Sequence, residues 1–208
     1  MKTGLTRAER QALTRAALLR SASRLICEHG LEGASIDSIA ADAGFTKGAF
    51  YASFASKEDM FLAVLDEKFS EELARLEATL TSPGDAVDVA RRAADDLISY
   101  VDRGPEWQRV YQEFIVHAAR NEPFRRELVA HLRAVRARIA ELFCDWTDAL
   151  GIEPVLPHED VATMIFVMAD GFILDRLVDH ELDNSLYTTM SEVFLRGLMA
   201  MVADRAGE

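Results

Sequence analysis

Helical spacing of apolar residues along almost the whole chain is the feature that most restricts its fold. Within each segment, apolar side chains recur every three or four residues, and Gly, Pro or Ser/Thr residues mark the breaks between segments. This spacing is typical of amphipathic α-helices, whereas half-buried strands alternate apolar and polar residues. The sequence therefore predicts an all-α protein with about nine helices.

Helix start and stop signals are clearest near the N-terminus. The first helix is predicted to run from about Thr6 to His29 and to stop at Gly30, because glycine readily adopts the left-handed conformation that ends helices. Ser35 and Thr46 are expected to cap two short helices that follow. These signals predict three helices ahead of a longer fourth one.

Two domains are expected from this order of helices. Residues 1–56 are predicted to form an N-terminal three-helix domain. Ser56 and Asp59 have the spacing of a capping box, which predicts that a long fourth helix opens there. Residues 57–208 are predicted to form a larger C-terminal helical bundle.

Charge is distributed unevenly between these two parts. The formal net charge of −12 argues against nucleic acid, because duplex DNA attracts basic surfaces. However, residues 1–57 hold eight Lys/Arg and five Asp/Glu, a balance of +3, so the rest of the chain carries −15. This asymmetry is typical of a small DNA-reading domain attached to an acidic body.

Several other classes of protein find no support in the sequence. No run approaches the roughly 18 apolar residues that span a bilayer, and the charged N-terminus has no secretory signal pattern, so a cytoplasmic protein without membrane contact is expected. Cys27 and Cys144 belong to no CxxC motif or Cys/His cluster, so neither a metal nor a cofactor is expected.

Two short helices joined by a glycine-containing turn favour a helix-turn-helix motif over residues 35–54. In such motifs the second helix enters the major groove of DNA. That helix is predicted over residues 47–53, and it begins with a cation, Lys47, and two small residues, Gly48 and Ala49. Small side chains let the backbone approach base edges, and Ala49 is suited to contact a thymine methyl group.

Phosphate contacts are expected beside this helix. Ser35 and Thr46 place hydroxyl and backbone N–H groups at helix N-termini, where an anion is favoured. Tyr51 and Lys57 are expected to hold phosphates from the flanks. Each residue also has a structural interpretation, because Ser and Thr cap helices of every kind and Tyr51 fits the rim of an amphipathic helix. The order of the signals, rather than any one residue, favours DNA binding.

A set of short motifs runs from the first helix into the fourth. They are Gly30, the pairs Ile39-Ala40 and Ala43-Gly44, the signature Tyr51-x-x-Phe54, and Ser56-Lys57-Glu58 followed by an apolar residue. Together they closely resemble the tetracycline-repressor (TetR) family of bacterial regulators. The resemblance covers about residues 12–72, and the remainder of the chain resembles the family in length and all-helical character.

This resemblance implies partners and contact residues. It implies a homodimer with two-fold symmetry, in which the last two helices of each subunit form a four-helix interface and the two reading heads bind a palindromic operator in double-stranded DNA. Ser35 is implied as a phosphate contact. The implied DNA contacts are Thr46, Lys47, Gly48, Ala49, Tyr51 and Lys57.

Two positions depart from the pattern of the family. Ala52 stands where a large polar or aromatic residue is common, which leaves the base preference open. Phe45 replaces the commoner Val or Ile of the turn, and it is expected only to enlarge the packing there. Phe50 and Phe54, spaced by four, are expected to pack inside the domain.

Stripes of Met, Phe and branched residues run along the last two predicted helices. Gly171 and Gly197 would let helices approach closely, so a self-complementary dimer interface is expected, with packing inside the subunit as the alternative. The expected interface residues are Met168, Phe172, Met190, Phe194 and Met201.

An apolar pocket is expected among the helices of the body, where it would take a small apolar or aromatic effector. Ordinary core packing is the alternative for each of its residues. The expected lining residues are Trp107, Tyr111, Phe114, Phe143, Trp146 and Met164.

These features lead to one functional hypothesis and two alternatives. The hypothesis is a repressor that leaves its operator when an effector changes the separation of the two reading heads. One alternative is a constitutive DNA-binding dimer without a ligand. The other is an all-helical enzyme, for which the sequence offers no ExxH pair on facing helices and no nucleophile with an evident base.

Overall fold

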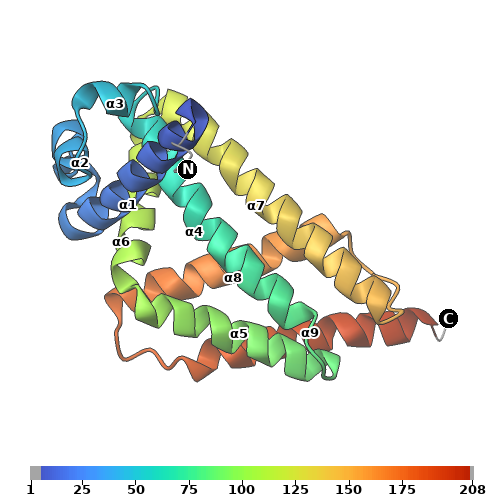
Figure 1. The fold of residues 1–208 in the computed structure, drawn as a ribbon. Coiled ribbons are helices and arrows are strands. Elements are labelled where there is room, and N and C mark those ends of the chain that lie inside the picture. Colours follow the sequence, from blue (N-terminus) through green and yellow to red (C-terminus); the bar gives the residue numbers. More distant parts are fainter. Residues whose placement is uncertain (1–5, 207–208) are drawn as a thin grey trace. The chain divides into compact units, whose positions relative to one another are not determined.

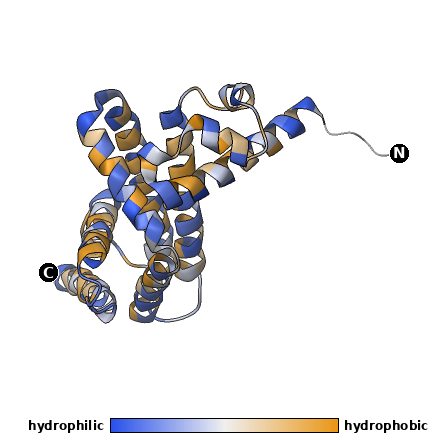
Figure 2. Ribbon diagram, turned by 90° about the vertical axis from the view of Figure 1, so that its left-hand side faces the viewer, coloured by the Kyte–Doolittle hydropathy of each residue, from blue (hydrophilic) through white to orange (hydrophobic). Residues whose placement is uncertain are grey.

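The computed structural model describes residues 6–206, apart from the side chains at positions 103, 105 and 206. Within this range the chain forms nine α-helices and no strand (Figure 1), so the all-α prediction is confirmed. Hydrophobic and hydrophilic residues are interspersed along most helices (Figure 2), as expected for amphipathic helices. The helices are α1 (Arg7–Gly33), α2 (Ile36–Asp42), α3 (Lys47–Tyr51), α4 (Lys57–Leu80), α5 (Ala86–Arg103), α6 (Pro105–Arg120), α7 (Glu122–Ala149), α8 (His158–Val178) and α9 (Ser185–Ala206).

Two compact units are formed by these helices. The first contains the described residues up to Lys68 together with Arg109–Leu128, and the second contains Phe69–Gln108 and the residues from Val129 onward. This division differs from the predicted boundary after residue 56. The start of α4, most of α6 and the start of α7 belong to the first unit. The division depends on contacts between residues that are far apart in the sequence. Helical periodicity carries no information about such contacts.

Helix α1 begins with a capping box and is interrupted near its end. Thr6 Oγ1 accepts a hydrogen bond from the Glu9 N–H at 3.2 Å, and the Glu9 carboxylate accepts one from the Thr6 N–H at 2.7 Å. Gly30 has φ 72° and ψ 178°, so the helical path breaks there. A further helical turn continues to Gly33, which means that α1 ends slightly later than its predicted stop.

Side chains from two other helices bind the backbone at this break. The N–H of Leu31 donates to Glu113 Oε2 of α6 at 2.7 Å. Lys57 Nζ of α4 donates to the carbonyl oxygen of Leu31 at 2.6 Å. Both backbone groups of Leu31 are therefore hydrogen-bonded, as a partly buried helix interruption requires.

In the second unit, α5 packs along α9, and an apolar cluster joins this pair to α8. Ala94 and Ile98 of α5 pack in this cluster with Phe172 of α8 and Tyr187 of α9. All four side chains are at least nine-tenths buried. This cluster fixes one face of α8 and one face of α9 inside the subunit.

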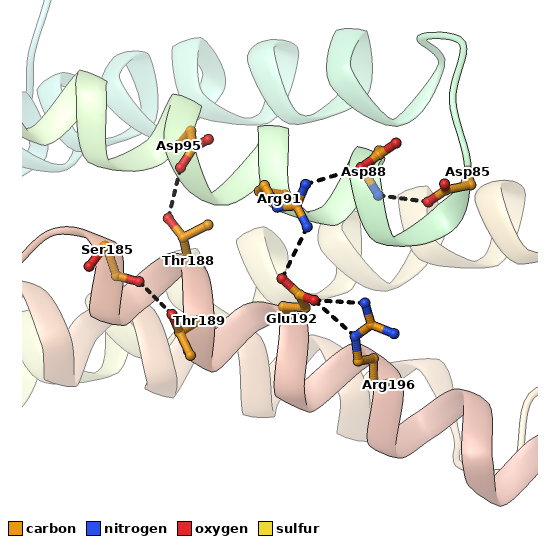
Figure 3. A network of polar contacts seen from close by, with 9 residues as sticks. All are labelled: Asp85, Asp88, Arg91, Asp95, Ser185, Thr188, Thr189, Glu192 and Arg196. Atoms are coloured by element: carbon orange, nitrogen blue, oxygen red, sulfur yellow. Dashed lines mark hydrogen bonds and ion pairs between the residues drawn. The ribbon is translucent and has the colours of Figure 1, made fainter.

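Polar contacts accompany the same pair of helices (Figure 3). Arg91 of α5 donates to Glu192 of α9 at 3.2 Å, and Thr188 of α9 donates to Asp95 of α5 at 2.7 Å. Arg196 also donates to Glu192, at 2.9 Å. These exposed contacts add little stability individually, and they align two helices that the apolar cluster already holds together.

Tyr187 gives the second unit a testable dependence on alkaline pH. Its side chain is almost fully buried, and burial raises its pKa from 10.0 to about 12. Because the folded state keeps the proton more firmly than the unfolded chain, the contribution of Tyr187 to stability is complete below pH 10 and is lost as the pH rises toward 12. We expect the Tyr187→Phe variant to lose less stability than the wild type between about pH 9 and about pH 11 in urea unfolding. Equal losses in the two proteins would contradict this assignment.

Candidate DNA-binding site

The turn between α2 and α3 is closed by backbone hydrogen bonds. Gly44 has φ 78°, a left-handed conformation that favours glycine. Its N–H donates to the carbonyl of Ala41 at 3.1 Å, and the N–H of Phe45 donates to the carbonyl of Ala40 at 2.8 Å. The backbone therefore fixes the direction in which α3 leaves the turn.

Both short helices have side-chain caps at their N-termini, as predicted. Ser35 Oγ accepts from the N–H of Ser38 at 3.0 Å, and Thr46 Oγ1 accepts from the N–H of Ala49 at 3.3 Å. Both cap residues are exposed. A cap uses only one of the free N–H groups at a helix N-terminus, so other N–H groups remain available to an anion there.

Polar contacts from α1 hold α2 in place. Ser21 Oγ lies 3.1 Å from the carbonyl oxygen of Ile39 and 2.5 Å from Asp42 Oδ2. Arg24 forms an ion pair with the same Asp42 carboxylate. The hydrogen bond from Ser21, followed by that from Arg24, lowers the pKa of Asp42. The supporting helix of the motif is thus fixed to α1 beside its buried Ile39 side chain.

The surface of α3 separates into an exposed face and a buried face. Thr46, Lys47 and Gly48 are exposed, and Tyr51 is 53% exposed. Ala49 is half-buried. The expected packing residues lie on the other side, where Phe50 and Phe54 are fully or almost fully buried and their ring centroids are 5.5 Å apart. The predicted packing role of these two phenylalanines is confirmed.

Two predicted lysine contacts differ in their surroundings. Lys47 is exposed, and its Nζ lies 3.1 Å from Asp37 Oδ2 on α2, an ion pair that a phosphate can readily replace. Lys57 is half-buried, bonds the carbonyl of Leu31 and lies 5.2 Å from the centre of the Phe61 ring. Burial lowers the pKa of Lys57. Lys57 therefore has a structural role in addition to the DNA contact predicted for it.

The residues expected to line an effector pocket are distributed over both units. Tyr111 and Phe114 belong to the first unit, where Phe114 packs 5.8 Å from Phe61 and 6.1 Å from Phe124 between ring centroids. Trp107, Phe143, Trp146 and Met164 belong to the second unit.

Within the second unit these four residues have different surroundings. Phe143 and Trp146 pack edge to face at 5.6 Å in an apolar cluster with Leu142, whereas Met164 is exposed. Trp107 is buried. For Phe114, Phe143 and Trp146, the observed contacts are those of a core, the alternative interpretation of the sequence.

A groove of about 490 Å³ lies between α5 and α9 in the second unit. Most of its lining residues are charged or carry hydroxyl groups, so it is not the apolar pocket that the sequence predicts. None of the six predicted pocket residues lines it. Its lining residues are Arg91, Asp95, Ile98, Ser99, Asp102, Asn184, Ser185, Thr188, Thr189 and Glu192.

The expected dimer-interface residues also have different surroundings. Phe172 is only 5% exposed and packs 5.3 Å from Tyr187, so it belongs to the core of the subunit rather than to an interface. Met168 and Met190 pack partly buried against the same cluster, and Phe194 is half-buried. The remaining predicted residue, Met201, is exposed.

A different set of residues forms the exposed apolar face of α8. Its members are spaced alternately by three and four residues, the spacing of a seam between packed helices. All five are exposed, and the last of them, Val178, is 83% exposed. We call this set the α8 stripe. It consists of Met164, Val167, Gly171, Leu174 and Val178.

Among residues 6–206, no group of three His, Cys, Asp or Glu side chains is arranged to hold a metal ion. No helix in the same range is both long and apolar enough to cross a membrane.

An all-α chain in which two short capped helices around a glycine turn follow a long first helix, with the second short helix exposed, defines a helix-turn-helix transcription regulator. Comparison with known families agrees with this class. The model of bacterial regulatory proteins of the tetR family matches residues 18–64, and the model of the C-terminal region of BetI-type transcriptional repressors matches residues 86–200. The chain therefore belongs to the TetR family of DNA-binding transcriptional regulators.

Individual relatives cover most of the chain. The transcriptional repressor AcnR of Corynebacterium glutamicum is 29% identical over 77% of this chain and 80% of its own length. A TetR-family regulator of Mesorhizobium loti has a similar fold, with a TM-score of 0.74, 18% identity, and coverage of 95% of this chain and 98% of that one. The regulator FadR of Bacillus subtilis, solved with stearoyl-CoA, has a TM-score of 0.66, 19% identity, and coverage of 88% and 96%.

Proposed function

We propose that this regulator is a homodimeric repressor that acts in the cytoplasm and leaves a palindromic operator when a small effector binds its second unit. The observation that carries the proposal is the exposed, N-capped face of α3. A short helix that presents a cation, two small residues and a tyrosine to solvent has the chemistry to contact phosphates and base edges.

The proposed DNA contacts have unequal roles. Lys47 and Tyr51, exposed at the two ends of α3, would hold backbone phosphates, while Gly48 and Ala49 would let the helix approach the bases. Ser35 and Thr46 would bind phosphates through their hydroxyl groups and the neighbouring N–H groups. Lys57 would extend the contact only by exchanging its hydrogen bond to the backbone for one to a phosphate.

The proposed dimer is supported by the α8 stripe. Apolar side chains at this spacing would be exposed to water in a lone subunit, and an isologous contact around a two-fold axis would bury them. Gly171 lies within the stripe and would allow close approach of the partner helix. On α9, Leu186, Val193 and Met201 are also exposed and would extend the same interface.

A pair of charges in the α8 stripe is expected to separate the subunits. The Val167→Glu, Leu174→Glu double variant would place two carboxylates in the interface, where burying an unpaired charge costs several kcal/mol. We expect a monomer by size-exclusion chromatography with light scattering, against a dimer for the wild type. Ala137→Glu, at an exposed position on α7, is the control and is expected to stay dimeric. A double variant that remains a dimer would place the interface elsewhere.

The effector is proposed to be a small apolar or aromatic molecule. Support comes from the family and from FadR, a protein of similar fold that was solved with stearoyl-CoA. Thermal melting with stearoyl-CoA, free fatty acids and small aromatic compounds tests this proposal, because a ligand of the folded state raises the melting temperature. A true effector must also cause the protein to dissociate from operator DNA in a gel-shift assay. If no compound in a broad panel both raises the melting temperature and releases the protein from DNA, the alternative of a constitutive DNA-binding dimer without a ligand is favoured.

A further inference from the structure

The C-terminal end of α3 is held partly by side chains of another helix. α3 contains only five residues, and a helix this short is not stable by itself in water. Local bonds satisfy part of its C-terminal end, since the N–H of Ala52 donates to Gly48 O at 3.1 Å and the N–H of Phe54 donates to Phe50 O at 2.9 Å. Two further carbonyl groups, directly after the helix, are bonded by side chains of α1.

Arg15 and Gln11 are these two side chains. Arg15 Nη1 donates to the carbonyl oxygen of Ser53 at 3.0 Å, in a partly buried position. Gln11 Nε2 donates to the carbonyl oxygen of Ala52 at 3.3 Å. The two residues are four positions apart, so they lie on one face of α1. We call this pair the α1 clamp.

Arg15 makes a second contact in the same place. Its guanidinium carbon lies 4.2 Å from the centre of the Phe54 ring. The planar guanidinium group donates hydrogen bonds in its plane while its face stacks on an aromatic ring, a fixed geometry that the compact ammonium group of a lysine does not reproduce. The two contacts together fix the residues after α3 more firmly than a single hydrogen bond would.

A chain of aromatic rings connects this contact with the exposed face of α3. The Phe54 ring lies 5.5 Å from the Phe50 ring, and the Phe50 ring meets that of Tyr51 edge to face at 5.4 Å. Phe50 is completely buried, so its position follows that of its neighbours. A shift at Arg15 would therefore reach Tyr51 through packed side chains.

We propose that Arg15 is a positioning residue for operator recognition, which orients α3 through the Ser53 carbonyl and the Phe54 ring without contacting DNA. The inference rests on the proposed role of α3 as the DNA-reading helix. Base readout requires side chains placed within about 0.5 Å of their productive position. Loss of the clamp would therefore weaken binding to the correct sequence while leaving the general attraction to phosphates unchanged.

The test compares specific with non-specific binding in Arg15→Ala and Arg15→Lys. The operator probe is a duplex that the wild type enriches from random DNA by binding-site selection. Fluorescence anisotropy with this operator and with a random duplex of equal length would be measured at several salt concentrations, below the melting temperature of each variant. For Arg15→Ala we expect about tenfold weaker operator binding, with unchanged random-duplex binding and an unchanged salt slope, because no phosphate contact is lost. Arg15→Lys, which keeps the charge, should still show most of the loss.

Controls separate the clamp from charge and from folding. Arg20→Ala removes the same charge from an exposed position of α1 and should leave the ratio of operator to random-duplex affinity unchanged. Gln11→Ala removes the other arm of the clamp and should lower this ratio in the same direction by a smaller factor. The Gln11→Ala variant therefore still tests the clamp if Arg15→Ala does not fold.

Three outcomes would overturn the inference. The first is operator binding by Arg15→Ala that is as tight as that of the wild type. The second is wild-type operator affinity in Arg15→Lys, which would show that only the charge matters. Equal losses on both duplexes, with a salt slope smaller by about one, would mean that Arg15 contacts a phosphate. Lys47→Ala and Tyr51→Ala are measured in parallel. If these two variants lose operator binding while Arg15→Ala does not, only the positioning role of Arg15 is rejected. Normal operator binding by all three variants would reject the role of α3 as the DNA-reading helix.

Discussion

Replacing Gly30 with alanine is expected to lower the free energy of unfolding of the first unit by about 3 kcal/mol. Two effects combine at this position. Its φ of 72° and ψ of 178° lie in a region that only glycine populates readily. In addition, an added Cβ would lie 3.0 Å from both carboxylate oxygens of Glu113, the group that accepts the hydrogen bond from the Leu31 N–H.

Gly44→Ala is the matched control for this prediction. Gly44 also has a positive φ, 78°, but an added Cβ there would meet no atom within 4 Å apart from those of its chain neighbours. Only the backbone cost remains, about 1 kcal/mol. Chemical denaturation of both variants measures the difference. Equal losses of stability would mean that the contact between Glu113 and the break in α1 contributes nothing.

The Lys47→Ala, Tyr51→Ala double variant is expected to bind the operator about a hundredfold more weakly, while its melting temperature stays close to that of the wild type. Both side chains are exposed, so the fold loses little when they are removed. Lys47→Ala alone should also reduce the salt dependence of binding, because one phosphate contact is lost. Anisotropy titrations with operator DNA, together with thermal melts, measure both effects.

Lys57→Ala provides a contrast within the same set of predicted contacts. Its ammonium group bonds the carbonyl of Leu31 and is half-buried, so its removal leaves a partly buried acceptor unpaired. We expect this variant to lose about 1–3 kcal/mol of stability. A variant that loses operator affinity at full stability would show instead that Lys57 acts mainly on DNA.

Local sequence signals are sufficient to predict where the first four helices begin. Ser35 and Thr46 cap α2 and α3 as expected, and Ser56 Oγ accepts from the N–H of Asp59 at 3.0 Å at the start of α4. These interactions join residues three positions apart, so the local sequence contains everything that they require. The prediction that Phe50 is buried while Tyr51 is exposed follows from the same local periodicity.

Long-range contacts could not be predicted in this way. Glu113 bonds Leu31 across 82 positions, and nothing in either local pattern indicates the partner. The boundary of the first unit differs from residue 56 for the same reason. The hydrogen bond from Lys57 to Leu31 spans 26 positions, and the motif around Lys57 gives no sign of it.

Helical periodicity also does not decide which face of α8 packs inside the subunit. The stripe of Met, Phe and branched residues on this helix, together with Gly171, predicts Met168 and Phe172 as interface residues. Phe172 instead fills the core beside Tyr187, and the exposed face contains smaller residues such as Val167 and Val178. The alternating spacing of the α8 stripe is visible in the sequence. This spacing alone is enough to make the stripe a second candidate for the dimer interface. It does not show which of the two faces is exposed.

Binding-site selection from random duplex DNA, with the wild type and with the Lys47→Ala, Tyr51→Ala double variant, tests the central claim most directly. The claim is that α3 reads the operator in a two-fold dimer. The wild type is predicted to enrich an inverted repeat whose half-sites are separated by about one helical turn or a multiple of it, and the double variant is predicted to enrich no motif. The same motif enriched by both proteins, or a wild-type motif without two-fold symmetry, would contradict the account.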